Sequence, residues 1–465
     1  MKTPASVTGS RRFCFLFKKT GQKQNRGKYL QNLSKKWRLC SGAASSEGIP
    51  LLQTGTILPF FCLSARNLLL AAHWLVYCPL IYMHYGFMTK LPSLFLLCGL
   101  FLVSCAGSRP IDKKATAETK ALYQNMGKLA KKHTLFGHQH ATEYGHGWAG
   151  EPDRSDVKSV TGSHPAVIGV DFSGFSGRSP EAIQHAKEEV RKNVVDTYHR
   201  GGVTTAAWHF SNPVSKGGFY WVDSLSLPAV KYIIPGGQAH EDYKKILREI
   251  GDWAHSVKGA DGTLAPVIFR PYHEFDGEWF WWGKPHTSRE EFITLWRFTV
   301  SYLRDSLNVH NFLYAFSPDN RFTTEAEFLE RYPGDAWVDM VGMDNYGDMG
   351  RDRYAPDIAA QKLKIVSDYA QKAHKLAAFT ETGLESIPDT TWWTNTLLKT
   401  MQRYPMRMSY VLVWRNDTRS PTHFYAPFPG QVSVPDFLKF YQDPYTLFEK
   451  DLPQMYRRKK FLGLF

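Results

Sequence analysis

The chain has 465 residues, enough for one large domain or for two or three of ordinary size. Its net charge of +14 is concentrated in residues 1–87, which contain twelve lysines and arginines and one acid, so the rest of the chain carries only +3. A nucleic-acid-binding protein needs a basic face on its folded domain, and we therefore expect no nucleic-acid partner.

All six cysteines lie within the first 105 residues. The rest of the chain therefore has no disulfide bond, no thiolate metal site and no cysteine nucleophile. Aromatic residues make up 14% of the chain, with 14 tryptophans and 23 tyrosines. These side chains combine a flat apolar face with a polar group, so their excess fits either a binding cleft or a tryptophan-rich core.

Residues 88–105, MTKLPSLFLLCGLFLVSC, begin with methionine and a nearby lysine, continue with a short apolar stretch and end in small residues. This pattern is typical of a signal peptide, and the segment is too short to span a membrane. The last four residues resemble a bacterial lipobox, which implies a lipidated Cys105 as the mature N-terminus. An ordinary signal peptide that happens to contain a cysteine is the alternative.

The resemblance to a lipobox implies a location in the bacterial cell envelope, with attachment to the membrane by the lipid alone. Ala106, and not an aspartate, follows the cysteine, which favours the outer membrane, at its periplasmic or its surface face. Residues 1–87 precede a complete signal peptide, so we interpret them as an over-extended reading frame outside the fold, with translation starting at Met88. A membrane-anchored extension is the rival interpretation.

After a polar linker over residues 106–115, we expect one catalytic domain over residues 116–465. It begins with a helical pattern over residues 115–132, and amphipathic helices are expected at 179–201 and 240–257. Eight short apolar runs, each ending in polar residues, read as strands: 134–140, 166–172, 204–210, 266–274, 312–319, 339–347, 376–383 and 408–417.

Continuous apolar strands that alternate with helices favour a parallel sheet covered by helices. Eight of them predict an α/β protein with the (β/α)8 TIM-barrel fold. The first connection is the weakest, with only a short helical candidate at residues 153–160. A doubly wound open sheet is the alternative fold.

In such barrels the active site lies at the C-terminal ends of the strands. The predicted strands end in residues able to bind or react, namely His138, His140, Asp171, His209, Glu274, Asp319, Tyr346, Glu381, Trp414 and Arg415. The sequence therefore predicts one polar site at this end of the barrel.

Glu274 ends the fourth predicted strand and Glu381 the seventh. Glycoside hydrolysis needs two such carboxyl groups across one cleft, and a separation of about 5–5.5 Å gives retention through a covalent glycosyl-enzyme. The acid must stay protonated, and we expect burial against Trp279 to raise its pKa. The nucleophile must stay ionised, and Arg270 or Tyr346 could supply the hydrogen-bond donors.

The segment RPYHEFDGEWFWWG, residues 270–283, surrounds Glu274 with six aromatic side chains. Sugar rings pack their C–H faces on aromatic planes, so the segment has the composition of an acid beside sugar platforms. We expect one or two of these rings to contact substrate and the others to pack in the rim of the barrel.

Residues 115–450 resemble the bacterial β-mannanases of glycoside hydrolase family 26, whose clan of retaining barrel enzymes carries the acid/base on strand four and the nucleophile on strand seven. The resemblance rests on RPYHEFDGEWFWWG, AAWHF, GMDNYG and LVWRND. It implies that Glu274 is the acid/base and Glu381 the nucleophile, without a metal ion or cofactor. It implies a substrate-binding set of His209, Arg270, His273, Trp279, Tyr346, Trp414 and Arg415.

The nucleophile segment, TETGLE, departs slightly from the family pattern and offers Glu385 as a second candidate. We favour Glu381, because it ends the strand. The resemblance implies a monomer that cleaves β-1,4-linked mannan, glucomannan or galactomannan by endo or mannobiose-releasing action. Mixed-linkage β-glucan and β-1,3-xylan remain alternative substrates of the same mechanism.

Two other classes of protein share part of this pattern. The HQH motif at residues 138–140 has the form of a metal-dependent amidohydrolase, but the fifth and sixth predicted strands end without histidine. A non-catalytic glycan-binding lipoprotein would keep the aromatic residues and lose a carboxylate, whereas both are present. The long segment 211–238 after the third strand, with Tyr220 and Trp221, is expected to wall the cleft.

Overall fold

The computed structural model describes residues 109–215 and 217–457. The predictions for residues 1–87, for the signal peptide 88–105 and for Cys105 lie outside these residues. Within the described ranges, no helix combines the length and the apolar character needed to cross a membrane.

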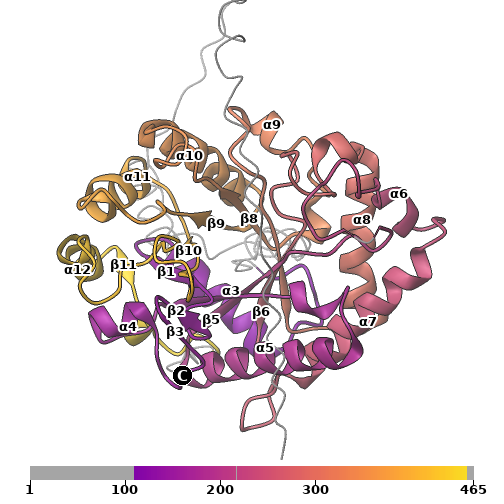
Figure 1. Cartoon of the computed structure of the whole chain (residues 1–465), viewed down its shortest axis with the longest axis horizontal. Coiled ribbons are helices and arrows are strands. Elements are labelled where there is room, and N and C mark those ends of the chain that lie inside the picture. Colours follow the sequence, from indigo (N-terminus) through magenta and orange to yellow (C-terminus); the bar gives the residue numbers. More distant parts are fainter. Residues whose placement is uncertain (1–108, 216, 458–465) are drawn as a thin grey trace, which may run out of the picture. The chain divides into compact units, whose positions relative to one another are not determined.

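Eight parallel strands form a closed barrel (Figure 1), which confirms the predicted TIM-barrel fold. The open-sheet alternative is wrong, because the last barrel strand pairs with the first, with Leu135 beside Tyr410 and His138 beside Val413. The barrel strands are β1 (Thr134–Gln139), β4 (Val167–Asp171), β5 (Val203–Trp208), β6 (Val267–Pro271), β7 (Phe312–Phe316), β8 (Met340–Asp344), β9 (Leu376–Thr382) and β10 (Tyr410–Val413).

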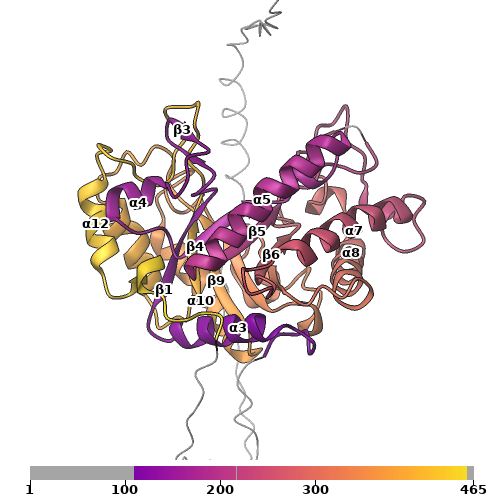
Figure 2. The same ribbon diagram turned by 90° about the horizontal axis from the view of Figure 1, so that it is seen from below.

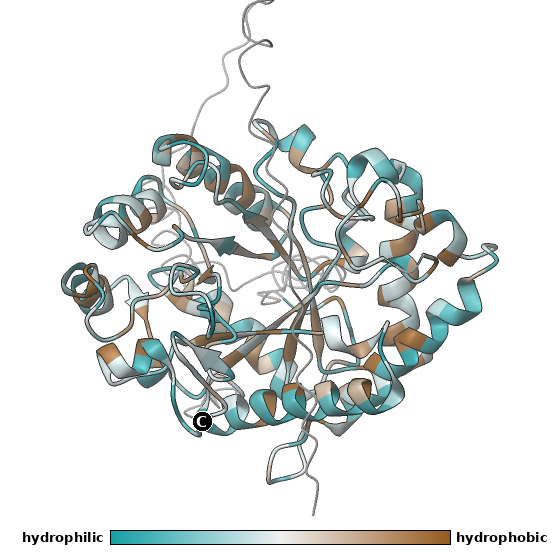
Figure 3. Cartoon of the chain, in the orientation of Figure 1, coloured by the Kyte–Doolittle hydropathy of each residue, from teal (hydrophilic) through white to brown (hydrophobic). Residues whose placement is uncertain are grey.

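Helices and short helical turns surround the barrel. The α-helices are α3 (Ala117–Leu129), α4 (Asp156–Thr161), α5 (Pro180–Arg200), α6 (Val230–Ile233), α7 (His240–Ser256), α8 (Arg289–Ser301), α9 (Glu325–Phe328), α10 (Pro356–Lys372), α11 (Lys399–Gln402) and α12 (Val434–Gln442). Figure 3 shows hydrophilic and hydrophobic residues alternating along α5 and α7, as expected of helices with one buried face.

Local sequence signals fix where α5 begins and ends. The side chain of Ser179 accepts a hydrogen bond from the backbone N–H of Ala182, and Pro180 occupies the first helical position. Gly201 ends the helix with φ of +86°, a conformation that glycine adopts without a steric penalty. The predicted helix at residues 179–201 is thus confirmed.

The connection between the first two barrel strands contains more structure than the sequence indicated. The expected short helix is present as α4, but a two-stranded hairpin, β2 (Tyr144–Gly145) and β3 (Trp148–Ala149), precedes it. Asp156 fixes this hairpin, because its carboxylate accepts hydrogen bonds from the indole of Trp148 at 2.7 Å and from the backbone N–H of His146 at 2.7 Å.

Helix α3 closes the N-terminal end of the barrel, where Leu122, Tyr123 and Met126 pack beneath the buried strand residues. Figure 2 shows α3 at one end of the barrel and β3 at the other. Two residues of the predicted linker contact the barrel, since Ile111 donates its backbone N–H to Asp339 at 2.7 Å and Asp112 pairs with His310 at 2.7 Å.

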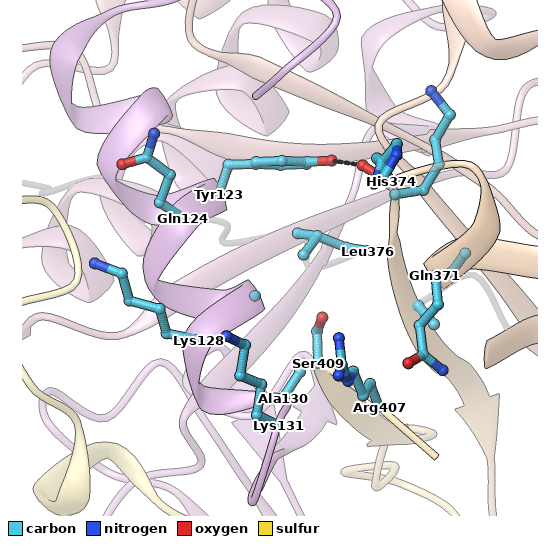
Figure 4. A pocket seen from close by; sticks show the side chains of 14 residues that line it. Tyr123, Gln124, Lys128, Ala130, Lys131, Gln371, His374, Leu376, Arg407 and Ser409 are labelled. Atoms are coloured by element: carbon cyan, nitrogen blue, oxygen red, sulfur yellow. Dashed lines mark hydrogen bonds between the residues drawn. The ribbon is translucent and has the colours of Figure 1, made fainter. Parts of the chain in front are cut away.

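A cavity of about 510 Å³ lies at this N-terminal end, between α3 and α10. Figure 4 shows Lys131, Arg407 and Ser409 around it, with Leu376 near its centre. Its described lining residues include no carboxylate. The cavity therefore lacks the two carboxyl groups that the predicted active site requires. It also lies at the opposite end of the barrel from that site.

Candidate active site

A smaller cavity of about 330 Å³ lies at the C-terminal ends of the strands. Larger cavities occur elsewhere on the barrel, so size alone does not identify the site. This cavity is distinguished by its lining, which combines two glutamates with histidines and aromatic rings. The lining residues are His209, Tyr220, His273, Glu274, Trp279, Phe280, Tyr346, Arg351, Glu381, Trp414, His423 and Tyr425.

Glu381 lies near the end of β9 and is 3% exposed. Tyr346 donates its hydroxyl to one carboxylate oxygen at 2.9 Å, and the guanidinium of Arg270 donates to the other. Both donors expected from the sequence are therefore present. Hydrogen bonds of this kind stabilise the ionised form of a carboxylate.

Arg270 lies beneath the cavity and does not line it. Its guanidinium also donates to Asp344 at 2.6 Å and to Ser317 at 3.0 Å. Thr380 donates to the second oxygen of Asp344 at 2.6 Å. Thr380 can approach so closely because its neighbour on β8 is Gly342, where a Cβ atom would lie 2.4 Å from the threonine methyl group.

Glu274 stands on a turn beyond β6, where its backbone N–H donates to the carbonyl of Ser317 at 2.9 Å. Glu274 and Tyr272 both have left-handed backbones, with φ of +52° and +50°. Such conformations cost non-glycine residues about 1–3 kcal/mol each and are often found at functional sites. The turn brings the carboxyl group of Glu274 to the wall of the cavity.

The pKa of Glu274 is raised well above its ordinary value, mainly by burial and then by the nearby carboxyl groups of Asp344, Asp319 and Glu381. Trp279 acts differently from the sequence-based expectation. Its indole N–H donates to Glu274 at 2.6 Å, and this hydrogen bond lowers the pKa, because it stabilises the carboxylate. Burial and like charge therefore favour the protonated form of Glu274, and the hydrogen bond from Trp279 partly opposes them.

The aromatic residues of segment 270–283 divide as expected between the cavity and the core. Trp279 and Phe280 line the cavity. Trp281 and Trp282 are fully buried, and their indole groups donate to the carbonyls of Phe210 at 2.6 Å and His273 at 2.8 Å. The buried pair thus fixes the loop that carries the acid.

Two histidines form the wall of the cavity beside Trp414. His209 is held by Asp171, which accepts hydrogen bonds from its ring Nδ1 and, at 3.2 Å, from its backbone N–H. The ring of His273 meets that of His209 edge to face at 4.6 Å. Burial, with the charge of Arg270, lowers the pKa of His273 well below its ordinary value, so this ring is neutral.

Seven of the predicted site residues lie together in the cavity: His209, His273, Glu274, Trp279, Tyr346, Glu381 and Trp414. Arg270 lies beneath them. Arg415 does not line the cavity. Its guanidinium binds Asp417 at 2.7 Å and lies 6.0 Å from the ring of Tyr144.

Five lining residues were outside the predicted site set: Tyr220, Phe280, Arg351, His423 and Tyr425. Tyr220 belongs to the segment that we expected to wall the cleft. It pairs with Phe280 through an antiparallel bridge, and the N–H of Trp221 donates to the carbonyl of Trp279 at 2.7 Å.

The remaining three, Arg351, His423 and Tyr425, come from loops beyond β8 and β10, where no strand-end pattern marked them. His423 binds Glu385 at 2.6 Å. Glu385 itself is half-exposed and does not line the cavity, so its position gives no support to its role as an alternative nucleophile.

Three side chains, His273, Asp344 and Glu381, could present metal-ligand atoms within 4.8 Å of one another. Arg270 already donates to both carboxylates, so a cation there would meet a guanidinium. The amidohydrolase motif also lacks support, because His140 pairs with Glu143 at 2.6 Å and His138 is buried in β1. The donor set therefore does not fit a metal centre.

The family model described as glycosyl hydrolase family 26 matches residues 111–424. A mannan endo-1,4-β-mannosidase of Bifidobacterium adolescentis is 37% identical over 285 residues, which is 58% of this chain but only 27% of that protein. The chain therefore matches about a quarter of the length of this curated relative.

Two solved structures resemble the barrel over nearly their whole length. GH26C from a Muricauda species is 38% identical with a TM-score of 0.70 and covers 75% of this chain and 96% of its own. The GH26 β-mannanase BoMan26A from Bacteroides ovatus is 40% identical with a TM-score of 0.69 and covers 74% and 98%.

Replacing Arg270 tests the buried ion pairs beneath the cavity. In Arg270→Met, Asp344 and Glu381 lose their counter-charge, and we expect the free energy of unfolding to fall by about 3–5 kcal/mol, as when one partner of a buried pair is removed. Urea denaturation followed by tryptophan fluorescence measures the loss. The double variant Arg270→Met/Asp344→Asn should lose less, because only one charge is left unpaired. A loss below about 1 kcal/mol in the single variant would contradict this account.

Proposed function

We propose that this chain, which belongs to glycosyl hydrolase family 26, is a retaining mannan endo-1,4-β-mannosidase. One observation carries the proposal: two glutamates share a cavity in opposite environments. Burial and neighbouring carboxyl groups raise the pKa of Glu274, whereas the carboxylate of Glu381 accepts hydrogen bonds from Arg270 and Tyr346. Two carboxyl groups whose environments differ in this way suit an acid and a nucleophile.

In the first step, protonated Glu274 gives its proton to the glycosidic oxygen while Glu381 attacks the anomeric carbon. The bond between that carbon and the leaving oxygen breaks, and a covalent glycosyl-enzyme forms. In the second step, Glu274, now a carboxylate, takes a proton from water as the water attacks the anomeric carbon. Glu381 leaves, the configuration is retained, and Glu274 is protonated again.

Arg270 and Tyr346 serve the nucleophile in this scheme. Each donates to a different oxygen of Glu381, which fixes the carboxylate and stabilises its charge before attack and after release. Tyr346 also lines the cavity, so it can reach a bound sugar. Arg270 lies beneath the cavity, and we therefore assign it to positioning the nucleophile and not to binding substrate.

A β-1,4-mannan is the proposed substrate, in unsubstituted, glucomannan or galactomannan form. The names of the Bifidobacterium and Bacteroides relatives support this assignment, as does a cavity walled by Tyr220, Trp279 and Trp414 that can hold sugar rings. Mixed-linkage β-glucan and β-1,3-xylan are the competing substrates, since the same two glutamates could cleave them.

A product assay tests the function. The enzyme is incubated with mannan, glucomannan, galactomannan, mixed-linkage β-glucan and β-1,3-xylan, and the products are separated and followed by NMR. We expect manno-oligosaccharides from the mannans alone, released first as the β-anomer. Cleavage of the glucan or xylan instead would replace the substrate, and initial release of the α-anomer would overturn the retaining mechanism.

Three glutamine variants test the assigned roles of the glutamates, with Glu385→Gln as the matched control. Glu274→Gln should lower kcat on mannan by about 10²–10⁴-fold, the usual contribution of acid–base catalysis. Glu381→Gln should lower it at least as much, because the glycosyl-enzyme cannot form without the nucleophile. Both variants should retain mannohexaose binding. Glu385→Gln should keep near-normal activity, because that side chain lies outside the cavity. A large loss in Glu385→Gln with an active Glu381→Gln would exchange their roles.

We also propose that Cys105 is acylated and anchors the enzyme in the cell envelope. The support is the sequence LVSC at residues 102–105, after an apolar segment. Intact mass of the native envelope protein should correspond to a chain that begins at a lipid-modified Cys105, and Cys105→Ser should release the enzyme from membranes. A mature chain that retains residues before Cys105 would refute this proposal.

A further inference from the structure

A second large cavity lies beside the hairpin β2–β3, at the flank of the barrel where α5 passes. Its volume is about 760 Å³, within the range of protein sites that bind small organic ligands. The lining includes Thr142, Glu143, Tyr144, Glu189, Lys192 and Asn193, and it also contains the acids Glu151, Asp153 and Asp196 and the bases His199 and Arg200. Figure 2 shows β3 at the end of the barrel away from α3.

The chemistry of this cavity suits a neutral ligand rich in hydroxyl groups. The wall of the cavity contains an aromatic ring, a hydroxyl, an amide, an ammonium and carboxylates. It therefore offers an apolar contact surface together with hydrogen-bond donors and acceptors. The carboxylates of Glu143 and Glu189 disfavour an anion.

Glu143 has one oxygen engaged and one free. Its Oε2 receives the ring Nδ1–H of His140 at 2.6 Å, whereas its buried Oε1 has no partner. A buried acceptor without a partner is costly, and a ligand hydroxyl donating to it would remove that cost.

Side chains that contact one another connect this cavity to the catalytic one. Trp414 lines the catalytic cavity, and the next residue, Arg415, lies 6.0 Å from the ring of Tyr144 in the second cavity. The ring of Tyr144 in turn stacks on His140 at 5.1 Å. Trp414, Arg415 and Tyr144 therefore form a continuous series of side chains from the catalytic cavity to the second one.

We propose that this second cavity binds sugar units of the polysaccharide remote from the bond that is cleaved. The inference rests on the proposed mannanase function and extends it, because it predicts a preference for long chains. Its occupant is a β-1,4-mannosyl segment continuous with the one in the catalytic cavity.

The test fills the cavity with a bulky side chain. Asn193→Trp, on α5, should lower kcat/KM for mannohexaose about tenfold and leave kcat/KM for mannotriose within about twofold, because only the longer substrate reaches the second cavity. Gln184→Trp is the matched control, since Gln184 is an exposed amide on the same helix outside the cavity, and it should change neither value. Asn193→Ala provides a second variant if the tryptophan disturbs folding.

The outcomes separate the inference from the function on which it rests. Equal changes for both substrates, or no change in either Asn193 variant, would overturn the second site while leaving the mannanase assignment intact. If the unmodified enzyme cleaves no mannan or manno-oligosaccharide, the proposed function fails first.

An independent observation concerns Arg321, on the loop after β7. Its guanidinium lies 5.0 Å from the centre of the Trp279 ring, binds Glu278 at 2.5 Å and lies 3.7 Å from Asp319. Trp279 in turn donates to Glu274 at 2.6 Å. A cation held by two carboxylates therefore stacks on the ring whose N–H contacts the acid.

We infer that Arg321 is a positioning residue that holds the indole of Trp279 against Glu274. The loop after β7 thereby helps to set the protonation of an acid carried by the loop after β6. The other groups that act electrostatically with Glu274 are Asp319, Asp344, Glu381, Tyr220, Tyr346 and Arg351, and the variants below leave them all in place.

The pH dependence of kcat/KM measures this positioning. Protonated Glu274 is the active form for the first step, so activity falls as pH rises through its pKa. Trp279 lowers that pKa, and Trp279→Phe should therefore shift the alkaline limb to higher pH. Arg321→Met and Arg321→Lys should shift it in the same direction, because both lose the planar guanidinium that stacks on the indole.

Two comparisons distinguish positioning from a direct effect of charge. If only the charge of Arg321 mattered, Arg321→Lys would leave the limb in place. In the double variant Arg321→Met/Trp279→Phe, positioning predicts no shift beyond that of Trp279→Phe alone, whereas a direct charge effect adds to it. An unchanged limb in Arg321→Lys or additive shifts in the double variant would overturn the inference.

Discussion

The buried guanidinium of Arg270 is the interaction on which the rest of the site depends. It joins the end of β6 to Asp344 on β8 and Glu381 on β9, so one side chain ties three strands together beneath the cavity. Burying two carboxylates this close without a counter-charge is costly. The guanidinium therefore stabilises the barrel and orients the proposed nucleophile through the same hydrogen bonds.

The same arrangement explains the contrast between the two glutamates. Arg270 and Tyr346 occupy both oxygens of Glu381, and Arg270 does not hydrogen-bond to Glu274. Glu274 sits on a left-handed turn among carboxyl groups, with Trp279 as its donor. Unequal sharing of donors thus gives two residues of one type different environments, which acid–base and nucleophilic roles at one bond require.

The two ends of the barrel have separate tasks. Helix α3 plugs the N-terminal end with apolar side chains, so stability at that end does not constrain the loops at the other. The C-terminal loops instead stabilise one another: Trp281 and Trp282 are buried, and Tyr220 pairs with Phe280 through an antiparallel backbone bridge. This division is the usual one in TIM barrels, and it lets the cleft vary while the scaffold stays fixed.

The sequence by itself determined the eight strands, the helices at 115–132, 179–201 and 240–257 and the two glutamates that follow or end strands, because hydrophobic periodicity and capping residues act locally. Only the tertiary structure decided which loops meet: it added the hairpin before α4, brought Tyr425 and Arg351 to the cavity and left Arg415 beside it. It also decided the sign of the effect of Trp279, since an aromatic residue near an acid can bury it or donate to it. Such outcomes depend on contacts between segments far apart in the chain, and no local pattern encodes those contacts.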